Sequence, residues 1–167
     1  DKALPHAYRI LLTPTGQPLT HEQVKTLSQQ RELIIVCGRY EGIDQRFTDL
    51  AHIDLELSMG DFVLSGGEIA AMALIDACIR QQPNALGDAQ SAHQDSFCEG
   101  LLEAPQYTRP KTLENKTVPS ILLSGNHKAI RQWRRKQALG RTWQYRLDLL
   151  SRLKLSSTDQ TLLSARA

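Results

Sequence analysis

Short apolar stretches of strand length alternate with helix-like stretches over the first half of the chain. Residues 7–12 are rich in β-forming side chains, residues 33–37 form a continuous apolar run, and residues 53–57 alternate between apolar and polar. A continuous run of that length is typical of a parallel strand that is covered on both faces. Strands that alternate with helices predict an α/β layer with a parallel sheet.

Helix signals follow the predicted strands. Thr20 and Gln23 have the spacing of a capping box, in which both side chains bond to backbone groups at the start of a helix. Together with apolar periodicity this predicts helices over residues 22–30, 43–51 and 67–83. Pro14, Gly16 and Pro18 disfavour strand structure, so we expect the first strand to end near residue 12.

The second half of the chain has a different pattern. Residues 84–108 are polar and interrupted by Gly87, Gly100 and Pro105, which indicates a linker long enough to be functional or mobile. The remainder is expected to form helices separated by short turns. These include a capped helix start at residues 124–126 and an amphipathic piece at residues 147–155.

Glycine-rich turns follow the predicted strands. They occupy residues 12–16, 37–44 and 58–68, and the last leads directly into the longest helix of the first half. Glycine admits positive φ and lets a ligand approach backbone amides, and a helix start adds unpaired N–H groups. Each turn taken alone indicates an ordinary connection, because none has the glycine spacing of a dinucleotide or Walker phosphate site. Together they predict a ligand cradled at the carboxyl ends of a parallel sheet.

The charged residues are divided unevenly along the 167-residue chain, although its formal net charge is only +2. Through residue 108 there are seven Lys and Arg against fifteen Asp and Glu, and from Arg109 onward there are thirteen against three. The later cations are mixed with Trp133, Trp143 and Tyr145, a combination that suits phosphate neutralisation and base stacking. Nucleic acid is therefore the expected partner; a basic helix on a membrane surface would need a cleaner apolar stripe.

The composition favours a soluble, cytoplasmic protein that is not embedded in a membrane. Hydrophobic residues make up 41% of the chain, with no apolar run of membrane-spanning length. The first ten residues lack the apolar core of a secretory signal. The three cysteines are far apart, which favours reduced thiols, and neither they nor the five histidines have the spacing of metal ligands. We therefore expect no zinc site.

Several longer segments carry a more specific signal. They are CGRYEGID at residues 37–44, SMGDFVLSGGE at 58–68, DSF at 95–97, QYTRP at 106–110 and VPSILLSGNHKAIRQWRRKQALGRTW at 118–143. In order and in content these segments closely resemble the bacterial tRNA (guanine-N1-)-methyltransferases, which belong to the SPOUT group of trefoil-knot enzymes. The resemblance runs from about Arg9 to Leu150.

The resemblance implies a homodimeric enzyme that transfers a methyl group from S-adenosyl-L-methionine to N1 of the guanosine immediately 3′ of the tRNA anticodon. It also implies an α/β parallel sheet with a deep trefoil knot, followed by a small helical carboxyl-terminal domain. The corresponding parts are a knotted cofactor-binding domain at residues 1–83, a flexible interdomain linker at 84–108 and a basic tRNA-binding domain at 109–167. A knot has no local sequence signature, so this feature comes from the resemblance alone.

The resemblance also assigns residues to binding roles. The family's methyl-donor site falls on the glycine-rich turns, at Leu12, Thr13, Pro14, Gly38, Tyr40, Glu41, Ser58, Met59, Gly60, Asp61, Phe62, Val63, Leu64, Gly66 and Gly67. The basic residues expected to contact tRNA come instead from the pattern of cations and aromatics; they are Arg131, Arg134, Arg135, Lys136 and Arg141. The family uses a divalent cation such as Mg²⁺, but the sequence has no dedicated ligand cluster for one, so no metal-binding residue is assigned.

The chemistry of guanine N1 requires a base and a cation. N1 carries a proton at neutral pH, and negative charge accumulates toward O6 when that proton leaves. The resemblance assigns the base to Asp95 and the cation to Arg80. Considered alone, such an Asp is more often a cap or turn residue, and an Arg near a helix end more often a dipole partner. The family builds its active site from the knot of one subunit and the linker of the other.

Departures from the family are mild in the motifs and large at the amino terminus. Thr13, Met59 and Ala70 stand where the family commonly has Ser, Ile and Pro, and none of these differences removes a needed functional group. Family members carry an additional amino-terminal region with a further glycine-rich loop, and this chain begins after it. We expect residues 1–167 alone to be poorly active, since a sheet without its full set of strands exposes an unpaired edge.

Other functions compete with this interpretation. A ribose 2′-O-methyltransferase of the same superfamily would not require a carboxylate base at Asp95. A non-catalytic binding fragment would hold cofactor or RNA without turnover. A nicotinamide-dependent enzyme is disfavoured, because no fingerprint glycine triplet follows the first predicted strand.

Overall fold

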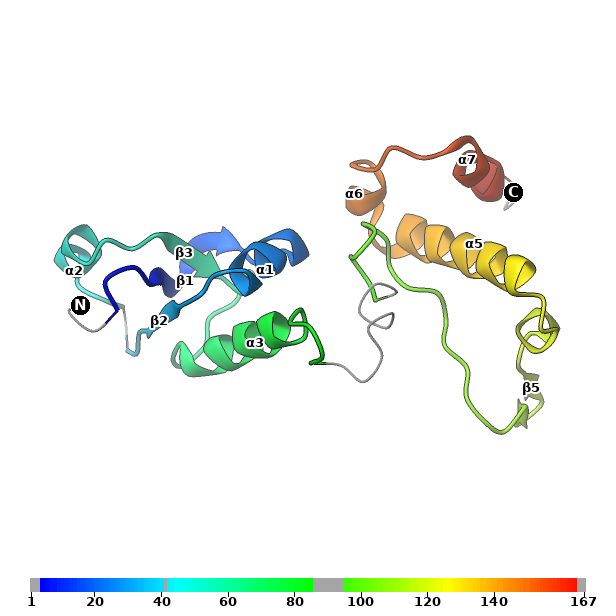
Figure 1. The fold of residues 1–167 in the computed structure, drawn as a ribbon, viewed down its shortest axis with the longest axis horizontal. Helices are drawn as coiled ribbons and strands as arrows, with labels where there is room; N and C mark the ends of the chain where they lie inside the picture. The colour runs from blue at the N-terminus through cyan, green and yellow to red at the C-terminus, as the bar shows by residue number, and fades with distance from the viewer. Residues whose placement is uncertain (1–3, 41, 86–94, 165–167) are drawn as a thin grey trace. The chain divides into compact units, whose positions relative to one another are not determined.

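The computed structural model of the chain describes residues 4–40, 42–85 and 95–164. The chain divides into two compact units, Asp1–Ala89 and Gln90–Ala167. The first contains a parallel sheet with helices, and the second is mainly helical (Figure 1). The predicted α/β class with a parallel sheet is therefore confirmed in the first unit.

The sheet of the first unit has the strand order β2-β1-β3, and both neighbours run parallel to β1. The strands are β1 (Tyr8–Pro18), β2 (Leu33–Cys37) and β3 (Leu55–Ser58). The helices are α1 (His21–Ser28), α2 (Gln45–Leu50) and α3 (Glu68–Ile79). The capping box predicted for α1 is present: Thr20 N donates to Gln23 Oε1 at 2.8 Å, and Gln23 N donates to Thr20 Oγ1 at 3.3 Å.

The first strand does not end where the sequence predicted. It extends to Pro18, with an irregularity in which both Leu12 and Gln17 pair with Leu57 of β3. The intervening residues bulge out of the ladder, so the predicted turn is an insertion within one strand. A Cβ on Gly16 would lie 2.4 Å from Leu57 N, so only glycine lets the returning chain pass this close to the β3 backbone.

The expectation that the second strand is covered on both faces is also wrong. Residues Leu33 to Val36 are half-buried and Cys37 is exposed. Within the described part of the chain, β2 pairs with β1 alone and forms an edge of the sheet. An edge strand has a backbone neighbour on one side only, so its side chains meet fewer packing partners.

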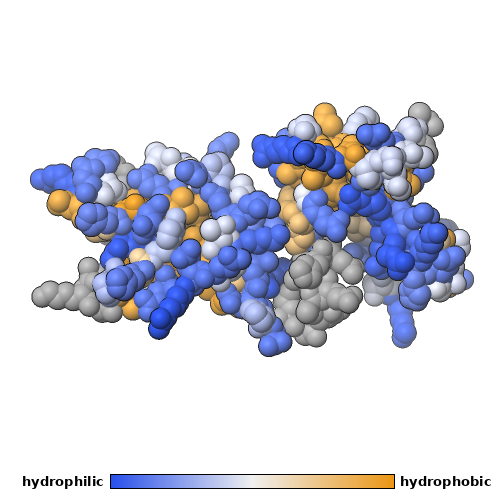
Figure 2. All heavy atoms as spheres, turned by 45° about the horizontal axis from the view of Figure 1, so that its top comes forward, coloured by the Kyte–Doolittle hydropathy of each residue, from blue (hydrophilic) through white to orange (hydrophobic). Residues whose placement is uncertain are grey.

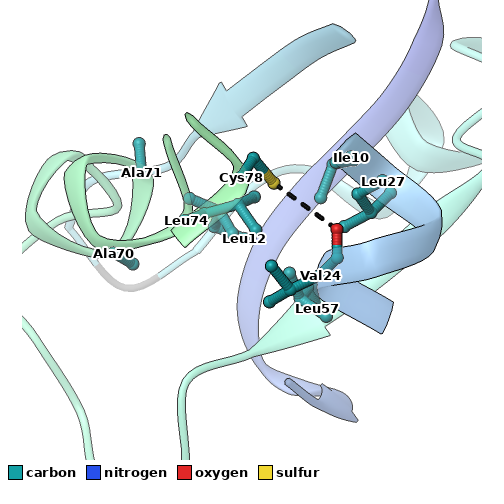
Figure 3. Close-up of a cluster of buried hydrophobic side chains, with 9 residues drawn as sticks. All are labelled: Ile10, Leu12, Val24, Leu27, Leu57, Ala70, Ala71, Leu74 and Cys78. Atoms are coloured by element: carbon teal, nitrogen blue, oxygen red, sulfur yellow. Dashed lines mark hydrogen bonds between the residues drawn. The ribbon is translucent and has the colours of Figure 1, made fainter. Parts of the chain in front are cut away.

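One apolar core joins the sheet of the first unit to α1 and α3 (Figure 3). Ile10 and Leu74 at its centre have no exposed surface. The other members are Leu12, Val24, Leu27, Leu57, Ala70, Ala71 and Cys78. Burying a large aliphatic side chain contributes roughly 1.5–3 kcal/mol, so this cluster is the main source of stability for the unit.

Helix α3 is apolar on its outer side as well. Ile69, Met72, Ile75 and Ile79 are each exposed by 45% or more. A helix that is apolar all round is usually covered on both sides in the assembled protein. Figure 2 shows that apolar residues interrupt a largely hydrophilic surface.

The second unit is organised around the long helix α5 (His127–Tyr145). The predicted cap at its start is confirmed, because Asn126 Oδ1 accepts a hydrogen bond from Ala129 N at 3.1 Å. The shorter elements are β4 (Thr112–Leu113), β5 (Lys116–Thr117), η1 (Ser120–Leu123), α6 (Leu147–Leu150) and α7 (Ser157–Ser164). The apolar pattern predicted neither the β4–β5 hairpin nor α7. The hairpin turns at Glu114 and Asn115, which both have positive φ without the usual Asn-Gly signal.

A second apolar core forms within this unit. Leu101, Leu139 and Leu150 are buried in it. The partly buried residues around them are Ala138, Leu153, Leu155, Leu162 and Leu163. Because Leu101 belongs to the predicted linker, at least this part of the linker packs within the helical unit. Residues 86–94 of the predicted linker lie outside the described residues.

Arg135 of α5 connects two other parts of the helical unit. Its guanidinium donates to Asp159 Oδ1 at 2.8 Å and Oδ2 at 3.1 Å, and to Glu99 Oε2 at 2.7 Å. Asp159 is 6% exposed. The hydrogen bonds from Arg135 outweigh the effect of burial and lower the pKa of Asp159 from 3.8 to about 2. The ionised Asp159 therefore favours the folded state.

This shift predicts a loss of stability in acid. A carboxylate whose pKa is lowered in the folded state contributes its stability above the unfolded pKa and loses it as pH falls through the folded value. The contribution of Asp159, on the order of 2 kcal/mol, should disappear between about pH 4 and pH 2. Asp159→Asn should destabilise the helical unit at pH 7 and flatten the pH dependence, as followed by chemical denaturation. Glu114→Gln removes an exposed carboxylate of the same unit and should change neither; equal pH profiles for Asp159→Asn and the wild type would contradict the assignment.

Candidate active site

Backbone contacts between glycines bring the second and third turns together. Gly67 N donates to Gly38 O at 2.9 Å, and Arg39 pairs with Gly66 in an isolated β-bridge. A Cβ on Gly67 would lie 2.8 Å from Cys37 Cα, closer than real Cβ atoms approach. Only glycine therefore lets the start of α3 come so near the end of β2.

The third turn is held from within by Ser58. The hydroxyl of this buried serine donates to Gly60 O at 3.1 Å and accepts from Gly60 N at 3.2 Å. Gly60 has φ of 142°, and Phe62 N donates back to Gly60 O at 2.9 Å. These hydrogen bonds give the turn a defined shape.

A cavity of about 700 Å³ lies among the three turns of the sheet unit. The residues of the predicted cofactor site that line it are Leu12, Thr13, Pro14, Gly38, Tyr40, Ser58, Met59, Phe62, Val63, Leu64, Gly66 and Gly67. Gly60 and Asp61 belong to the same turn but do not line the cavity. Glu41 lies outside the described residues.

The cavity also has lining residues that the sequence did not predict. Most lie within two positions of a predicted residue: Leu11, Thr15, Arg39, Gly42, Ile43, Leu57 and Ser65. Glu56, Gln45, Thr48 and Ala70 come from β3, α2 and α3. No local sequence pattern indicated that Gln45 and Thr48 line the cavity, because their position depends on how α2 packs against the turns.

An ion pair stands at the rim of the cavity. Arg39 Nε lies 2.6 Å from Glu68 Oε1, and both side chains are largely exposed. The hydrogen bond from Arg39 lowers the pKa of Glu68, which keeps this carboxylate ionised in the first turn of α3. The negative charge is favourable at a helix amino terminus, but solvent screening limits what the pair adds to stability.

The cavity suits a nucleoside-bearing cofactor in size and chemistry. Its volume falls within the range of roughly 300–1,000 Å³ that is usual for small-molecule sites. Met59, Phe62 and Leu64 line it with apolar side chains that are at least partly exposed and can meet a purine ring. A Cβ on Gly66 would lie 2.3 Å from Glu68 Oε2, so glycine also keeps this part of the cavity wall free of a clash with Glu68.

The two predicted catalytic residues belong to different units. Arg80 is the carboxyl-terminal cap residue of α3 in the sheet unit, where its backbone N–H donates to Asp76 O at 3.1 Å. Asp95 is half-buried in the helical unit, and its carbonyl oxygen accepts from Cys98 N at 3.4 Å. Neither residue lines the cavity.

The predicted RNA-binding residues fall into two groups. Arg131 and Arg134 are exposed on α5. The other three are partly buried: Arg135 binds two carboxylates, Arg141 Nη1 donates to Glu103 O at 3.5 Å, and Lys136 also has an interaction within the protein. The exposed pair is therefore better placed to meet a ligand from solvent.

The described residues contain no group of His, Cys, Asp and Glu side chains that could hold a metal ion. In the same part of the chain, no helix is long and apolar enough to span a bilayer.

Comparison with known proteins identifies the family. The family described as tRNA (Guanine-1)-methyltransferase TrmD matches residues 2–152. A tRNA (guanine-N(1)-)-methyltransferase of Stutzerimonas stutzeri is 55% identical over 155 residues, which cover 93% of this chain and 62% of that protein. Proteins of the same name from Aromatoleum aromaticum and Pseudoalteromonas atlantica are 54% and 56% identical, over 98% and 92% of this chain and 62% and 58% of their own lengths.

The matched region includes both the cavity and the long basic helix. The chain spans about three fifths of the length of the curated relatives that it matches. The match nevertheless covers most of this chain and includes all three glycine-rich turns. The chain belongs to the tRNA (guanine-1)-methyltransferase family.

Proposed function

We propose that the protein transfers a methyl group from S-adenosyl-L-methionine to N1 of the guanosine immediately 3′ of the tRNA anticodon. The observation that carries this proposal is the cavity among three glycine-rich turns in a chain of this family. The names of the relatives specify methylation of guanine N1 in tRNA. The exact nucleoside, the cytoplasmic location and the knot of the sheet unit are part of the proposal and rest on the family resemblance.

The cofactor is proposed to lie in the cavity, where it would supply an electrophilic methyl group. Met59, Phe62 and Leu64 would contact the adenine, and the backbone at Gly38 and Gly66 would lie near its polar edges. Binding in this scheme depends mainly on shape and on backbone contacts.

Proton removal is assigned to Asp95. N1 of guanine becomes nucleophilic when its proton passes to a carboxylate, and the new N–C bond forms as the methyl group leaves sulfur. Charge that develops on O6 in this step is stabilised by a cation, and we assign this role to Arg80. A ribose 2′-O-methyltransferase would not require a carboxylate base at Asp95, so dependence of the reaction on Asp95 distinguishes guanine from ribose as the target.

The helical unit is proposed to bind tRNA. From Arg109 onward the chain has thirteen Lys and Arg against three Asp and Glu, and Arg131 and Arg134 are exposed on α5. Tyr107 packs beside Trp133 with ring centroids 6.3 Å apart, which adds aromatic surface to the same helix. A basic helix with adjacent aromatic rings suits a phosphate backbone with unstacked bases.

A homodimer is proposed as the functional form. The exposed side of α3 presents the apolar side chains of Ile69, Met72, Ile75 and Ile79. A contiguous apolar surface of this kind is usually covered by another chain. Pairing of two subunits along α3 would cover it. In the family the base of one subunit serves the cofactor site of the other, and we propose the same arrangement for Asp95.

The proposed reaction is tested by methyl transfer to unmodified tRNA. Nuclease digestion and mass spectrometry should locate the new methyl group on guanine N1, and replacement of the target guanosine should abolish transfer. A methyl group on a ribose 2′-oxygen would favour the ribose methyltransferase. Cofactor binding without any product would favour a binding module.

Substitution of the turn glycines should reveal the cofactor site. Gly67→Ala places a Cβ against the backbone of Cys37, so α3 must move away from β2, whereas Gly38→Ala meets only the Ile43 side chain at 3.1 Å. We expect Gly67→Ala to weaken cofactor binding by about tenfold or more and Gly38→Ala to weaken it less, because a side chain yields more readily than backbone. Calorimetry with S-adenosylmethionine provides the measurement. Equal affinities of both variants and the wild type would place the cofactor elsewhere.

Asp95→Asn should separate chemistry from binding. The amide keeps the size of the side chain but cannot accept the N1 proton, so kcat should fall by roughly 10²–10⁴-fold. Cofactor affinity should stay within about twofold, since Asp95 does not line the cavity. Glu114→Gln, which changes an exposed carboxylate in the same unit as Asp95, is the control and should retain wild-type turnover. Wild-type kcat in Asp95→Asn would remove this residue from the reaction.

Arg80→Ala should reduce transition-state stabilisation. The loss of one donor to a developing oxyanion typically costs about 10²–10³-fold in kcat. Arg31→Ala removes an exposed arginine from the same unit and should leave kcat unchanged. If Arg80→Ala instead raises only the KM for tRNA, Arg80 contacts the nucleic acid without stabilising O6.

A further inference from the structure

We propose that Arg135 is a positioning residue, which holds the segment carrying Asp95 against α5 and does not contact RNA. This inference rests on the proposed function, because it concerns the placement of the proposed base. It revises the expectation that Arg135 binds RNA together with its neighbours on α5.

The hydrogen bonds of Arg135 already engage most of its guanidinium. Nε and Nη2 donate to the two oxygens of Asp159 at 2.8 and 3.1 Å, and Nη1 donates to Glu99 Oε2 at 2.7 Å. A bidentate arginine–carboxylate pair uses the planar fork that lysine lacks. The two carboxylates leave this cluster with a net negative charge, which would repel an RNA phosphate. Arg131 and Arg134, by contrast, are exposed.

Glu99 lies in the same closed loop as Asp95. Cys98 N donates to Asp95 O at 3.4 Å, Phe97 N donates to Leu101 O at 2.7 Å, and Gly100 N donates to Phe97 O at 3.0 Å. Phe97 and Gly100 both have positive φ, at 76° and 73°. These contacts make residues 95–101 one tightly turned piece of chain. An interaction at Glu99 therefore affects the position of Asp95.

One stripe of α5 receives this loop. Arg135, Leu139 and Thr142 are four and three residues apart, so they lie on the same side of the helix, and Arg146 follows at its end. Leu101 packs in the core with Leu139, and Leu102 N donates to Thr142 Oγ1 at 2.9 Å. The Arg146 guanidinium lies 5.8 Å from the centre of the Phe97 ring. The loop therefore contacts α5 along this whole stripe, and Arg135 provides the ion pair at one end of it.

Asp159 holds the other side of the guanidinium. Its carboxylate also accepts from Ser156 N at 3.2 Å, while Asp159 N donates to Ser156 Oγ at 3.1 Å, which fixes the start of α7. The ion pair with the buried Asp159 holds the Arg135 guanidinium in one orientation. In this orientation the guanidinium also pairs with the exposed carboxylate of Glu99. Arg135 thereby couples α7, α5 and the loop that carries Asp95.

Arg135→Lys and Glu99→Gln test the assignment. Lysine keeps the positive charge but loses the fork, and Glu99→Gln leaves the Arg135–Asp159 pair in place while weakening the link to the loop. We expect kcat for methyl transfer to fall about tenfold in Arg135→Lys and about threefold in Glu99→Gln, with the Kd for tRNA within twofold of wild type. Arg152→Lys makes the same chemical change at an exposed site of this unit and should change neither quantity.

The salt dependence of tRNA binding distinguishes the RNA-contact alternative. Loss of a phosphate contact lowers the slope of log K against log salt by about 1. Arg135→Gln should leave this slope unchanged, and Arg134→Gln should lower it. Because Arg135→Gln leaves Asp159 buried without its partner, the double variant Arg135→Gln/Asp159→Asn serves if the single variant does not fold. A lower slope with normal kcat in the Arg135 variants would overturn the proposal.

Hydrogen exchange tests the attachment independently of methylation. Amide exchange at residues 96–102 should become at least about tenfold faster in Arg135→Lys, and should stay unchanged in Arg152→Lys. Normal exchange in Arg135→Lys would overturn the proposal even if the wild type methylates tRNA. Faster exchange with unchanged kcat would show attachment without catalytic positioning and would overturn it as well. A wild type that does not methylate guanine N1 would refute the proposed function, and exchange would still decide whether Arg135 holds the loop.

Discussion

The close approach of α3 to the end of β2 is the constraint on which the candidate site depends. Gly67 N donates to Gly38 O at 2.9 Å, and there is no room for a Cβ at Gly67. This contact joins the second and third turns and sets one wall of the cavity. Gly16 has the same role in the first turn, because a Cβ at this position would clash with the backbone of β3. Backbone packing thus shapes the site before any side chain contributes.

The helical unit is organised by a different kind of contact. Its apolar core is small, with Leu101, Leu139 and Leu150 buried, and polar links along α5 supplement it. A buried carboxylate such as Asp159 is tolerable only with a charged partner, so Arg135 and Asp159 depend on each other. A helix rich in arginine therefore does two things at once: some of its cations hold the unit together, and others face solvent.

The proposed chemistry is distributed over both units. The sheet unit contains the cavity and Arg80, and the helical unit contains Asp95 and the exposed arginines of α5. If the helical unit binds tRNA as proposed, it would couple nucleic-acid recognition to proton transfer, because α5 contacts the loop of Asp95 and presents Arg131 and Arg134. Such coupling would limit reaction to a correctly held nucleoside.

The sequence alone determined those features of the structure that depend on residues close together in the chain. The capping box of α1, the apolar runs and the glycine-rich turns are local signals, and they predicted the three strands of the parallel sheet, the helices α1 to α3 and the turns among which the cavity lies. The motifs indicated the family as well. Only the tertiary structure decided that β1 continues past its bulge, that Gln45 and Thr48 reach the cavity, and that Arg135 faces Asp159 and Glu99. These outcomes depend on residues distant in the chain, 24 positions apart for Arg135 and Asp159, and no local pattern contains the packing that joins them.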